Sequence, residues 1–318
     1  MTQFTRRSVL ATGAAGAALG LSQVHAAAPL MGSWRPTYRR VKLGAFEVTT
    51  LLDGAAPVPN PQGIFGQDQS VEAVEGLLAA NNLPTDMMEF TFLPTIVNTG
   101  AELILFDTGN GAGAQPARGN LLAAMEAAGY SADQVDVVVI THMHPDHIGG
   151  MMTDGAPTFP NARYVMGATE YDFWNSTDRV GTGAEGIHTM VRNTLAPMAE
   201  KTTFVQPGDS VASGIEAMAA FGHTPGHMTY HIESEGKRVV LTADAANHFV
   251  LSLQRPDWEV RFDMDKAAAA QTRKDLFGML AADGVPFIGY HMPYPAMGFV
   301  EAAGDGFDYT PVSYQLNL

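Results

Sequence analysis

The sequence predicts one α/β domain of layered sheets and helices over residues 27–318. Two patterns in the 318-residue chain indicate this fold class. Apolar runs typical of buried strands alternate with segments of helical spacing, for example between residues 120 and 166. No linker rich in proline, glycine and serine divides the chain. With 46% hydrophobic and 16% charged residues, such a chain is expected to bury a substantial core.

The first 26 residues are expected to be a twin-arginine-type signal peptide that is removed on export. Arg6 and Arg7 precede an apolar stretch, residues 11–21, and Val24-His25-Ala26 offers a small-residue cleavage site. The apolar stretch is too short and too rich in glycine to form a stable membrane anchor. We therefore expect a periplasmic or secreted protein whose mature chain begins with an irregular arm at residues 27–40.

Charge and cysteine content restrict both the substrate and the metal ligands. The formal net charge of −15 disfavours nucleic acid and anionic membranes as partners and favours small neutral substrates. The chain contains no cysteine, so any metal ion must be held by histidine and carboxylate side chains. These ligands suit hydrolytic zinc, and they also suit manganese, cobalt and iron.

The first half of the domain is expected to contain strands and two helices. Alternation predicts a strand at residues 42–52, and prolines predict a loop at residues 55–66 that could overhang a pocket. Apolar residues recur at helical spacing in residues 69–81, which predicts a helix there. The elements expected next are paired strands at residues 90–99 and 102–107, a helix at 120–128 that ends near a glycine, a buried strand at 135–140 and a short strand at 163–166.

The second half is expected to consist of strands joined by tight turns, with one long helix. Residues 186–200 are weakly helical and could cover the site. The helix at residues 265–281 is well defined, because Asp263 or Asp265 can cap it, alanines fill it and Gly284 can end it. The strands of this half are expected at residues 215–221, 228–233, 238–244 and 285–289.

A cluster of histidines directly follows the buried strand at residues 135–140. The sequence THMHPDHIGG places His142 and His144 two residues apart, so both imidazoles project from the same side of an extended backbone. A proline and two glycines force a turn that can direct Asp146 and His147 toward a second ion, about 3.5–4 Å from the first. The stretch is therefore expected to be a metal-binding loop at a strand end.

Three further potential ligands follow apolar runs elsewhere in the chain. His223, Asp244 and His291 each lie at or near the end of an expected strand, where side chains from different strands converge. With the histidine cluster they make seven potential ligands, whereas a single-metal site needs about three or four. Two metal ions are therefore expected. A water shared by two ions would have its pKa lowered from about 15.7 to about 7, and the hydroxide so formed could attack a carbonyl carbon or a phosphorus centre.

These motifs resemble the metallo-β-lactamase superfamily over nearly all of residues 42–291. The resemblance rests on the His-x-His-x-Asp-His loop, the His-Thr-Pro-Gly-His turn at residues 223–227, Asp244 and His291. It implies an αββα sandwich, in which two mixed sheets pack face to face with helices outside and the metals at one edge. It also implies that Asp244 bridges two metals, the first held by His142, His144 and His223 and the second by Asp146, His147 and His291.

Departures within the superfamily narrow the expected chemistry. His144 stands where iron-dependent flavoprotein oxygen reductases carry glutamate, which argues against redox chemistry. The true β-lactamases lack a bridging carboxylate at the position of Asp244, so antibiotic hydrolysis is a remote alternative. The acidic composition argues against the nuclease and glyoxalase-II-like branches, and it leaves a metal-dependent phosphodiesterase as another remote alternative.

Within the superfamily, the chain resembles the methyl parathion hydrolase branch, near the quorum-quenching acyl-homoserine lactonases. It shares with that branch the segment from His291 to Gly298 and an exported precursor. The resemblance implies a homodimer that hydrolyses lactones, aryl esters or organophosphate triesters. Acyl-homoserine lactonases typically place a catalytic tyrosine three residues after the bridging aspartate, and this chain has Asn247 there. A dedicated acyl-homoserine lactonase is therefore the alternative interpretation.

Other residues near the ligands are expected to support the reaction. Asp107 is expected either to orient the metal loop or to form a turn, and His227 either to brace the turn at His223 or to be purely structural. Asp146 or Asp244 could act as the catalytic residue that relays a proton to the leaving group. Residues close to the metal motifs in sequence are expected to form the apolar walls of the substrate pocket, namely Phe65, Trp174, Phe249 and Met292.

Overall fold

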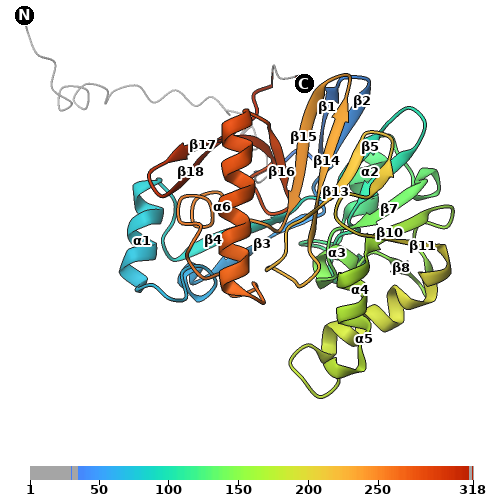
Figure 1. Ribbon diagram of the computed structural model, residues 1–318, viewed down its shortest axis with the longest axis horizontal. Coiled ribbons are helices and arrows are strands. Elements are labelled where there is room, and N and C mark those ends of the chain that lie inside the picture. Colours follow the sequence, from blue (N-terminus) through green and yellow to red (C-terminus); the bar gives the residue numbers. More distant parts are fainter. Residues whose placement is uncertain (1–29, 31–34, 315–316, 318) are drawn as a thin grey trace, which may run out of the picture. The chain divides into compact units, whose positions relative to one another are not determined.

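The computed structural model describes residue 30, residues 35–314 and residue 317, and one compact unit begins at Pro36. In this unit two large sheets pack face to face, with helices on their outer sides (Figure 1). The expected αββα sandwich of two mixed sheets is therefore confirmed. The signal peptide predicted at residues 1–26 lies outside the described residues. None of the helices in the described part of the chain has the length and apolar character needed to cross a bilayer.

The first sheet has seven strands in the order β1-β2-β5-β6-β7-β10-β11. Its first four strands pair antiparallel, whereas β6, β7, β10 and β11 run parallel. The strands are β1 (Tyr38–Leu43), β2 (Phe46–Leu51), β5 (Thr95–Asn98), β6 (Leu103–Phe106), β7 (Val137–Ile140), β10 (Arg163–Gly167) and β11 (Thr202–Val205).

The second sheet also has seven strands, which follow one another in sequence order. All neighbours are antiparallel except β15 and β16, which run parallel, so their carboxyl ends lie at the same edge. The strands are β12 (Ser210–Ala212), β13 (Ile215–Ala219), β14 (Met228–Ser234), β15 (Lys237–Ala243), β16 (Phe287–Gly289), β17 (Met297–Ala303) and β18 (Gly306–Pro311).

Apolar side chains from both sheets fill the space between them. Val48 and Val139 of the first sheet belong to the same buried cluster as Tyr230 and Leu241 of the second. A second cluster joins the outer face of the first sheet to its helices, and a third joins the second sheet to α6. The helices are α1 (Val71–Ala80), α2 (Leu121–Ala127), α3 (Pro145–Ile148), α4 (Ala168–Asn175), α5 (Glu185–Thr194) and α6 (Lys266–Asp283), with 3-10 turns η1 (Pro61–Gly63), η2 (Ala112–Ala114), η3 (Ala132–Gln134), η4 (Thr177–Arg179) and η5 (Ala196–Lys201).

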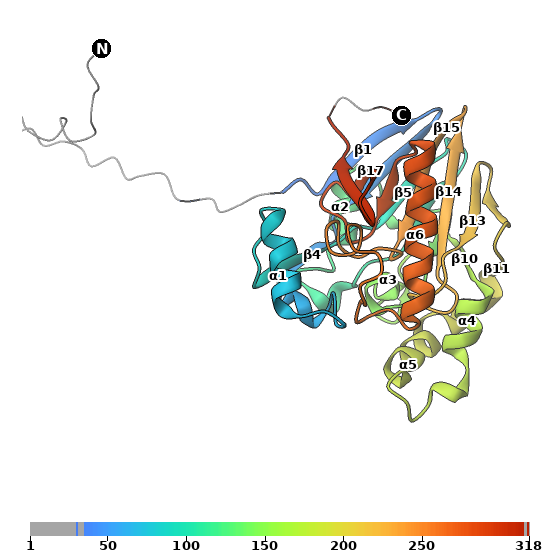
Figure 2. The same cartoon turned by 60° about the vertical axis from the view of Figure 1, so that its left-hand side comes forward.

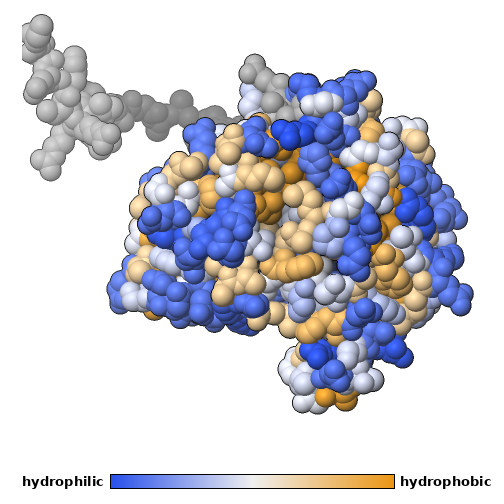
Figure 3. Space-filling model, viewed as in Figure 1, coloured by the Kyte–Doolittle hydropathy of each residue, from blue (hydrophilic) through white to orange (hydrophobic). Residues whose placement is uncertain are grey.

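The long C-terminal helix α6 confirms the prediction for residues 265–281. The Asp265 side chain accepts a hydrogen bond from the backbone N–H of Ala268 and so caps the helix. Gly284 ends it in the left-handed region, at φ +63°. Leu276, Phe277 and Leu280 are buried against the second sheet. Figure 3 shows that hydrophilic residues cover much of the face on which this helix lies, with smaller apolar areas between them.

Two predicted strands are each divided in the structure. The strand expected at residues 42–52 is a hairpin, because Gly44 turns the chain at φ +57° between β1 and β2. The irregular arm expected at residues 27–40 accordingly gives way to β1 at Tyr38, and its earlier part lies mostly outside the described residues. The strand expected at residues 90–99 is interrupted at Leu93-Pro94, so its two halves join different sheets.

The proline-rich segment at residues 55–66 was predicted to be a loop, but it contains a strand followed by the 3-10 turn η1. It forms β3 (Gly54–Pro59), which pairs only with β4 (Met87–Phe92). Prolines are tolerated at such a ribbon edge, where no further strand needs their missing N–H. Helix α1 packs beside this ribbon in both views (Figures 1 and 2) and buries Val74 and Leu78 against it. A second short ribbon is formed by β8 (Met152–Thr153) and β9 (Ala156–Pro157), and β17 and β18 form a hairpin near the C-terminus.

Candidate metal centre

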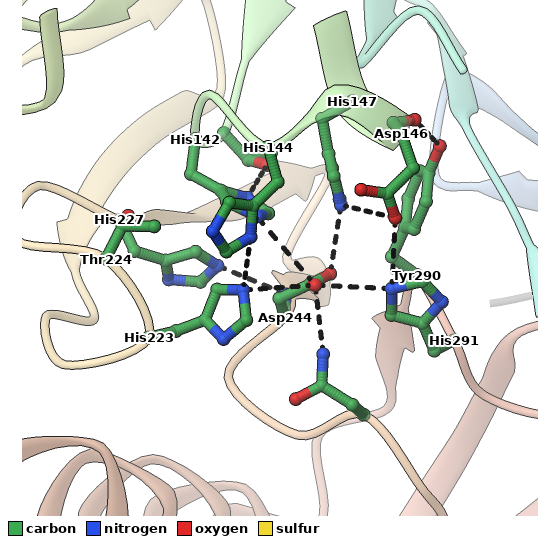
Figure 4. Close-up of polar contacts among 12 residues, drawn as sticks. His142, His144, Asp146, His147, His223, Thr224, His227, Asp244, Tyr290 and His291 are labelled. Atoms are coloured by element: carbon green, nitrogen blue, oxygen red, sulfur yellow. Dashed lines mark hydrogen bonds and ion pairs between the residues drawn. The ribbon is translucent and has the colours of Figure 1, made fainter. Parts of the chain in front are cut away.

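Four segments that follow strands bring the seven predicted ligands to one edge of the sandwich (Figure 4). The histidine cluster follows β7, His223 follows β13, Asp244 follows β15 directly and His291 follows β16. Their ligand atoms form two groups, and within each group all atoms lie within 4.8 Å of one another. The first group is His142, His144, His223 and Asp244, and the second is Asp146, His147 and His291.

The first group is built around Nδ1 of His144. The Nε2 atoms of His142 and His223 each lie 3.0 Å from that nitrogen. Asp244 Oδ2 lies 3.3 Å from His223 Nε2 and 3.8 Å from His142 Nε2. Three imidazole nitrogens and one carboxylate oxygen thus point at a single small volume, which is the ligand number of a tetrahedral divalent metal site.

The second group shares Asp244 with the first. Asp146 Oδ2 lies 3.4 Å from His291 Nε2 and 3.5 Å from His147 Nε2. Asp244 reaches the same two histidines, with Oδ1 3.3 Å from His147 Nε2 and Oδ2 3.2 Å from His291 Nε2. Its carboxylate therefore lies between the groups, where one side chain could serve both metals.

The hydrogen-bonding capacity of these residues fits metal ions better than hydrogen bonds alone. Nδ1 of His144 has two imidazole neighbours at 3.0 Å, although one ring nitrogen offers only a single proton or a single lone pair. His147 Nε2 and Asp244 Oδ1 are buried, and neither makes a hydrogen bond within the described part of the chain. Such unsatisfied buried groups are costly unless a cation is bound. The residues present fit two divalent ions.

Burial and neighbouring charges set the protonation states of the histidines to which a metal ion would bind. Burial, helped by the nearby His223, lowers the pKa of His144 to about 3, so this imidazole is neutral and ready to ligate. Burial also lowers the pKa of His223, but the carboxylates of Asp244 and Asp263 outweigh it and raise the pKa to about 9. A metal bound by His223 would therefore have to displace a proton.

Asp107 links the metal loop to the first sheet. Its carboxylate lies 2.8 Å from His147 Nδ1 and accepts hydrogen bonds from the Thr141 backbone N–H and hydroxyl. Its backbone lies in the left-handed region, at φ +62°, directly after β6, and these contacts correspond to the orienting role. Because Asp107 engages Nδ1 of His147, the ring presents Nε2 to the second group.

His227 is a brace and does not belong to either ligand group. Its Nδ1 lies 3.0 Å from the carbonyl oxygen of Ala220, and its Nε2 accepts a hydrogen bond of 3.1 Å from the backbone N–H of Asp244. Burial lowers its pKa to about 3, so the ring stays neutral and Nε2 remains an acceptor. His227 thereby connects the turn that carries His223 to the strand end that carries Asp244.

Two carboxylates that orient ligand side chains, those of Asp263 and Glu170, were not predicted from the sequence. No sequence pattern indicates this role for them. The sequence suggests Asp263 only as a helix cap. In the structure its Oδ1 lies 3.0 Å from His223 Nδ1, and its Oδ2 lies 2.7 Å from the buried guanidinium of Arg273. Glu170 lies on α4 and is 1% exposed.

The Glu170 carboxylate joins the two loops of the first group. It accepts hydrogen bonds from the backbone N–H of Met143, between two ligands, and from Nε1 of Trp174. Its other oxygen accepts from the Thr224 hydroxyl and the Gly226 N–H, beside His223. Gly226 approaches so closely that a Cβ there would lie 2.2 Å from the Glu170 backbone nitrogen. Four donors hold this buried carboxylate, and it ties the loops together.

Two further residues, missed as site residues, contact the second group and the shared carboxylate. The Tyr290 ring lies 3.9 Å from the His147 ring, measured between centroids, and its hydroxyl donates to the backbone oxygen of Asp146. Asn247 Nδ2 donates a 2.9 Å hydrogen bond to Asp244 Oδ2. Asn247 occupies the position at which acyl-homoserine lactonases typically place a tyrosine. Its side-chain amide holds the Asp244 carboxylate.

A pocket of about 550 Å³ opens onto the ligands, and its walls differ from those predicted. Phe65 and Met292 are fully buried in the core, and Trp174 lies behind His144 with ring centroids 6.1 Å apart. Phe249 stacks on His248, away from the lining. Closeness in sequence to a metal motif does not set the direction of a side chain. The residues besides the ligands that line the pocket are Ala56, Val58, Ile64, Phe90, Phe92, Asn110, Arg118, Pro145, Ile187, Arg261 and Phe262.

Comparisons with known proteins agree with this architecture. The family described as the metallo-beta-lactamase superfamily matches residues 94–286. The N-acyl homoserine lactonase AiiA of Bacillus thuringiensis subsp. kurstaki is 27% identical over 123 residues, which are 38% of this chain and only 43% of the relative. The solved structure of AidC, a dizinc quorum-quenching lactonase in complex with a product, N-hexanoyl-L-homoserine, is 28% identical with a TM-score of 0.82, and covers 88% of this chain and 98% of that one.

A second solved structure is similarly close. The hydrolase AbOPH, described as a member of the beta lactamase superfamily, is 26% identical with a TM-score of 0.81. The alignment covers 89% of this chain and 100% of that chain. The matched family segment contains the β-strands and turns that carry six of the seven ligands, and His291 follows it. The chain belongs to the metallo-beta-lactamase superfamily.

Proposed function

We propose that this protein is a dinuclear metal-dependent hydrolase of small lactones and aryl esters, with neutral organophosphate triesters as slower substrates. The observation that carries the proposal is the position of Asp244 between two ligand groups at the floor of an apolar pocket. Zinc is the proposed metal, because the histidine and carboxylate ligands suit it and a structural relative is a dizinc enzyme.

Two divalent ions bound at these groups would supply an acidified water as nucleophile and a Lewis acid for the scissile carbonyl or phosphoryl oxygen. The protein's own residues position and complete this chemistry. Asp107 and Asp263 hold His147 and His223 with Nε2 toward the ligand groups. Asn247 and the histidines fix the Asp244 carboxylate, so it is already in place before substrate binds.

Asp146 is the proposed residue for proton transfer to the leaving oxygen. Its side chain is 23% exposed and lines the pocket, whereas that of Asp244 is 3% exposed. Burial opposes ionisation of Asp146, but the nearby charge of His147 and a hydrogen bond from His291 lower its pKa to about 2. The carboxylate is therefore ionised at neutral pH, which is the form that can accept a proton.

The pocket suits a substrate with an apolar acyl or aryl part. Three phenylalanines line it, with Phe90 and Phe262 in edge contact at a centroid distance of 6.1 Å. Ala56 and Val58 of the ribbon strand β3 and Ile187 of α5 complete the apolar walls. Such a cavity can hold an aryl leaving group or an acyl chain while the scissile bond faces the ligands.

The test is a parallel measurement of kcat/KM on the zinc-loaded protein. Dihydrocoumarin, 4-nitrophenyl acetate, N-hexanoyl-homoserine lactone and methyl parathion are compared, with Asp244→Ala as the inactive reference. We expect lactone or aryl ester to lead and methyl parathion to trail, with two zinc ions per chain in the wild type by metal analysis. No turnover of any of the four substrates by protein that holds two zinc ions would refute the proposal.

An acyl-homoserine lactone is the second candidate substrate. It is favoured by the lactonase activity of AiiA and AidC and by the apolar walls of the pocket. Asn247 stands against it, because an amide next to the shared carboxylate cannot act as the phenol expected of a dedicated enzyme. The same four-substrate comparison decides between the two, since a dedicated enzyme would prefer N-hexanoyl-homoserine lactone to dihydrocoumarin.

Export and dimerisation complete the proposal. The twin arginines and the apolar stretch after them support export by the twin-arginine route. Cell fractionation should place the protein outside the cytoplasm, and replacement of Arg6 and Arg7 by lysine should retain it inside. The homodimer rests on resemblance alone, and sedimentation equilibrium of the purified protein should give twice the mass of one chain.

A further inference from the structure

Two arginines line the pocket together with largely apolar walls. Arg118 lies in the segment before α2, and Arg261 lies in the segment before α6. Apart from the ligands themselves, these are the charged side chains among the described residues that line this cavity. The acidic side chains of the lining, Asp146 and Asp244, both belong to the ligand groups.

Neither guanidinium is engaged by the protein's carboxylates. Within residues 35–314, neither makes an ion pair or a side-chain hydrogen bond; Arg118 instead lies over the Phe92 ring and Arg261 over the Phe262 ring, each at 5.6 Å from the centroid. Both rings line the pocket as well. The chain has 33 acidic and 18 basic residues, so carboxylate partners are abundant on its surface. Two exposed guanidiniums that line the pocket and keep their donors free are therefore available to a ligand.

The backbone that presents Arg118 is held rigidly. The buried carboxylate of Asp53 accepts hydrogen bonds from the N–H groups of Asn110, Gly119 and Leu121. The Asn110 side chain, which also lines the pocket, donates to the same carboxylate at 2.8 Å. Arg118 thus sits between two anchored points, so little order has to be imposed on its backbone when a ligand binds.

The backbone that presents Arg261 is held from both sides. Its N–H donates to the carbonyl of Ile64 at 2.7 Å, which attaches it to the pocket wall. The ammonium group of Lys266 binds the carbonyl oxygens of Val260, Arg261 and Asp263. Both arginines are therefore fixed at the backbone and exposed at the side chain, as expected of groups that recognise a ligand.

We infer that the preferred substrate carries an anionic group, most simply a carboxylate, on its acyl part, and that Arg118 and Arg261 bind it away from the scissile bond. The inference rests on the proposed function and assigns its substrate class. Guanidinium and carboxylate pair through charge-assisted hydrogen bonds, and Phe92, whose ring contacts both Arg118 and His291, suits an intervening methylene chain. With a net charge of −15 the surface as a whole repels anions, so a preference for an anion has to arise locally.

Paired substrates that differ only in charge test this inference. The 4-nitrophenyl monoester of adipic acid is compared with the same ester whose far end is a carboxamide, and the eight-carbon suberic acid pair covers a longer reach. We expect kcat/KM of the zinc-loaded wild type to be about five- to tenfold higher for the carboxylate in at least one pair, chiefly through KM, as expected of exposed charge pairs. Sodium chloride at about 0.5 M should reduce this preference, because the charges are accessible to solvent.

Variants locate the origin of the preference. Arg118→Gln and Arg261→Gln should each lower the carboxylate-to-carboxamide ratio, and the double variant should bring it to about one. Arg118→Lys and Arg261→Lys should each retain part of the preference for the carboxylate, because the positive charge remains. Arg238→Gln is the matched control: Arg238 is exposed, pairs with Asp283 at 3.7 Å and lies outside the pocket lining, so the same change in net charge should leave the ratio intact.

The outcomes separate this inference from the proposed function. Equal kcat/KM for carboxylate and carboxamide in the wild type would overturn the inference while leaving the hydrolase intact. A preference that survives in the double variant would also overturn it, since some other group would then bind the anion. Absence of turnover with neutral and anionic esters alike would instead count against the proposed function. Thermal unfolding of each variant checks that it is folded.

Discussion

Oδ1 of Asp263 lies 3.0 Å from Nδ1 of His223, and this contact decides which nitrogen the histidine offers to the first ligand group. The other carboxylate oxygen is held at 2.7 Å by Arg273, whose guanidinium is 1% exposed and also donates to the carbonyls of Pro256 and Trp258. A buried carboxylate is costly when unpaired, so the arginine makes it possible for Asp263 to stay ionised beside the histidine. Arg273, Asp263 and His223 form one chain of contacts that ends at Nε2.

Replacement of Asp263 by asparagine should weaken zinc binding. An amide can no longer stabilise the Nδ1–H of His223 as a carboxylate does, and Arg273 loses its charged partner. We expect the dissociation constant for zinc to rise about 10- to 100-fold, as for other residues that orient metal ligands. Competitive titration against a chromogenic chelator measures it.

Asp265→Asn is the matched control for that experiment. Asp265 is two residues away and exposed, and its side chain caps α6, a role that asparagine also fills. Zinc affinity should stay at the wild-type level in this variant. If both variants lost affinity equally, or if Asp263→Asn unfolded at lower temperature with unchanged zinc affinity, the orienting role of Asp263 would be wrong.

Replacement of Glu170 by glutamine should loosen both loops of the first group at once. The amide nitrogen cannot accept hydrogen bonds, so the donors of one loop are left unsatisfied, each at a cost of about 1–3 kcal/mol. We expect lower stability to urea and weaker zinc binding together. Asp172→Asn, an exposed change on the same helix, serves as control. Loss of stability with full zinc affinity would mean that Glu170 supports α4 alone.

Removal of metal should destabilise the protein without unfolding it. Without metal the buried atoms His147 Nε2 and Asp244 Oδ1 stay unsatisfied, and zinc that binds the folded state adds about 2.7 kcal/mol per site at 100 times its dissociation constant. Treatment with a chelator should therefore lower Tm by roughly 10 °C or more for the two sites together, at about 2–4 °C per kcal/mol. Two equivalents of zinc should restore it. An unchanged Tm in scanning calorimetry would show that the groups hold no metal.

His248 should contribute to the pH dependence of stability. Burial lowers its pKa to about 4, from 6.5 when exposed, and its Nδ1 accepts hydrogen bonds from the N–H groups of Val250 and Leu251. Protonation therefore favours the unfolded chain. The stability linked to this residue is complete above pH 6.5, declines as the pH falls from 6.5 to 4, and is lost below that range, by about 3 kcal/mol in all.

The variant His248→Asn isolates that effect. Asparagine can accept the same backbone hydrogen bonds but does not titrate in this range. Urea unfolding at several pH values should show the difference in free energy between wild type and variant shrinking or reversing as the pH falls from 6.5 to 4. Parallel curves over this range would contradict the prediction.

The sequence determined the identity of the ligands and their places in the chain. His142, His144 and Asp244 follow apolar runs directly, and local periodicity is sufficient to recognise a buried strand and the turn at its end. The long helix before Gly284 was equally clear, because its cap, its alanines and its terminal glycine lie within one stretch of chain. In each case the information is held by residues that are close together in sequence.

Apart from Asp107 and His227, the residues that surround those ligands are apparent only in the tertiary structure. Glu170 contacts Thr224 across 54 residues, Asp263 contacts His223 across 40, and the pocket walls come from a proline-containing ribbon and the segments that carry Arg118 and Arg261. No local pattern marks such residues, because a buried carboxylate is stabilised by donors that only packing brings within 3 Å of it. The direction of a side chain is likewise set by packing and not by its place in the sequence. Trp174 and Phe65 lie in the core because other residues pack around them.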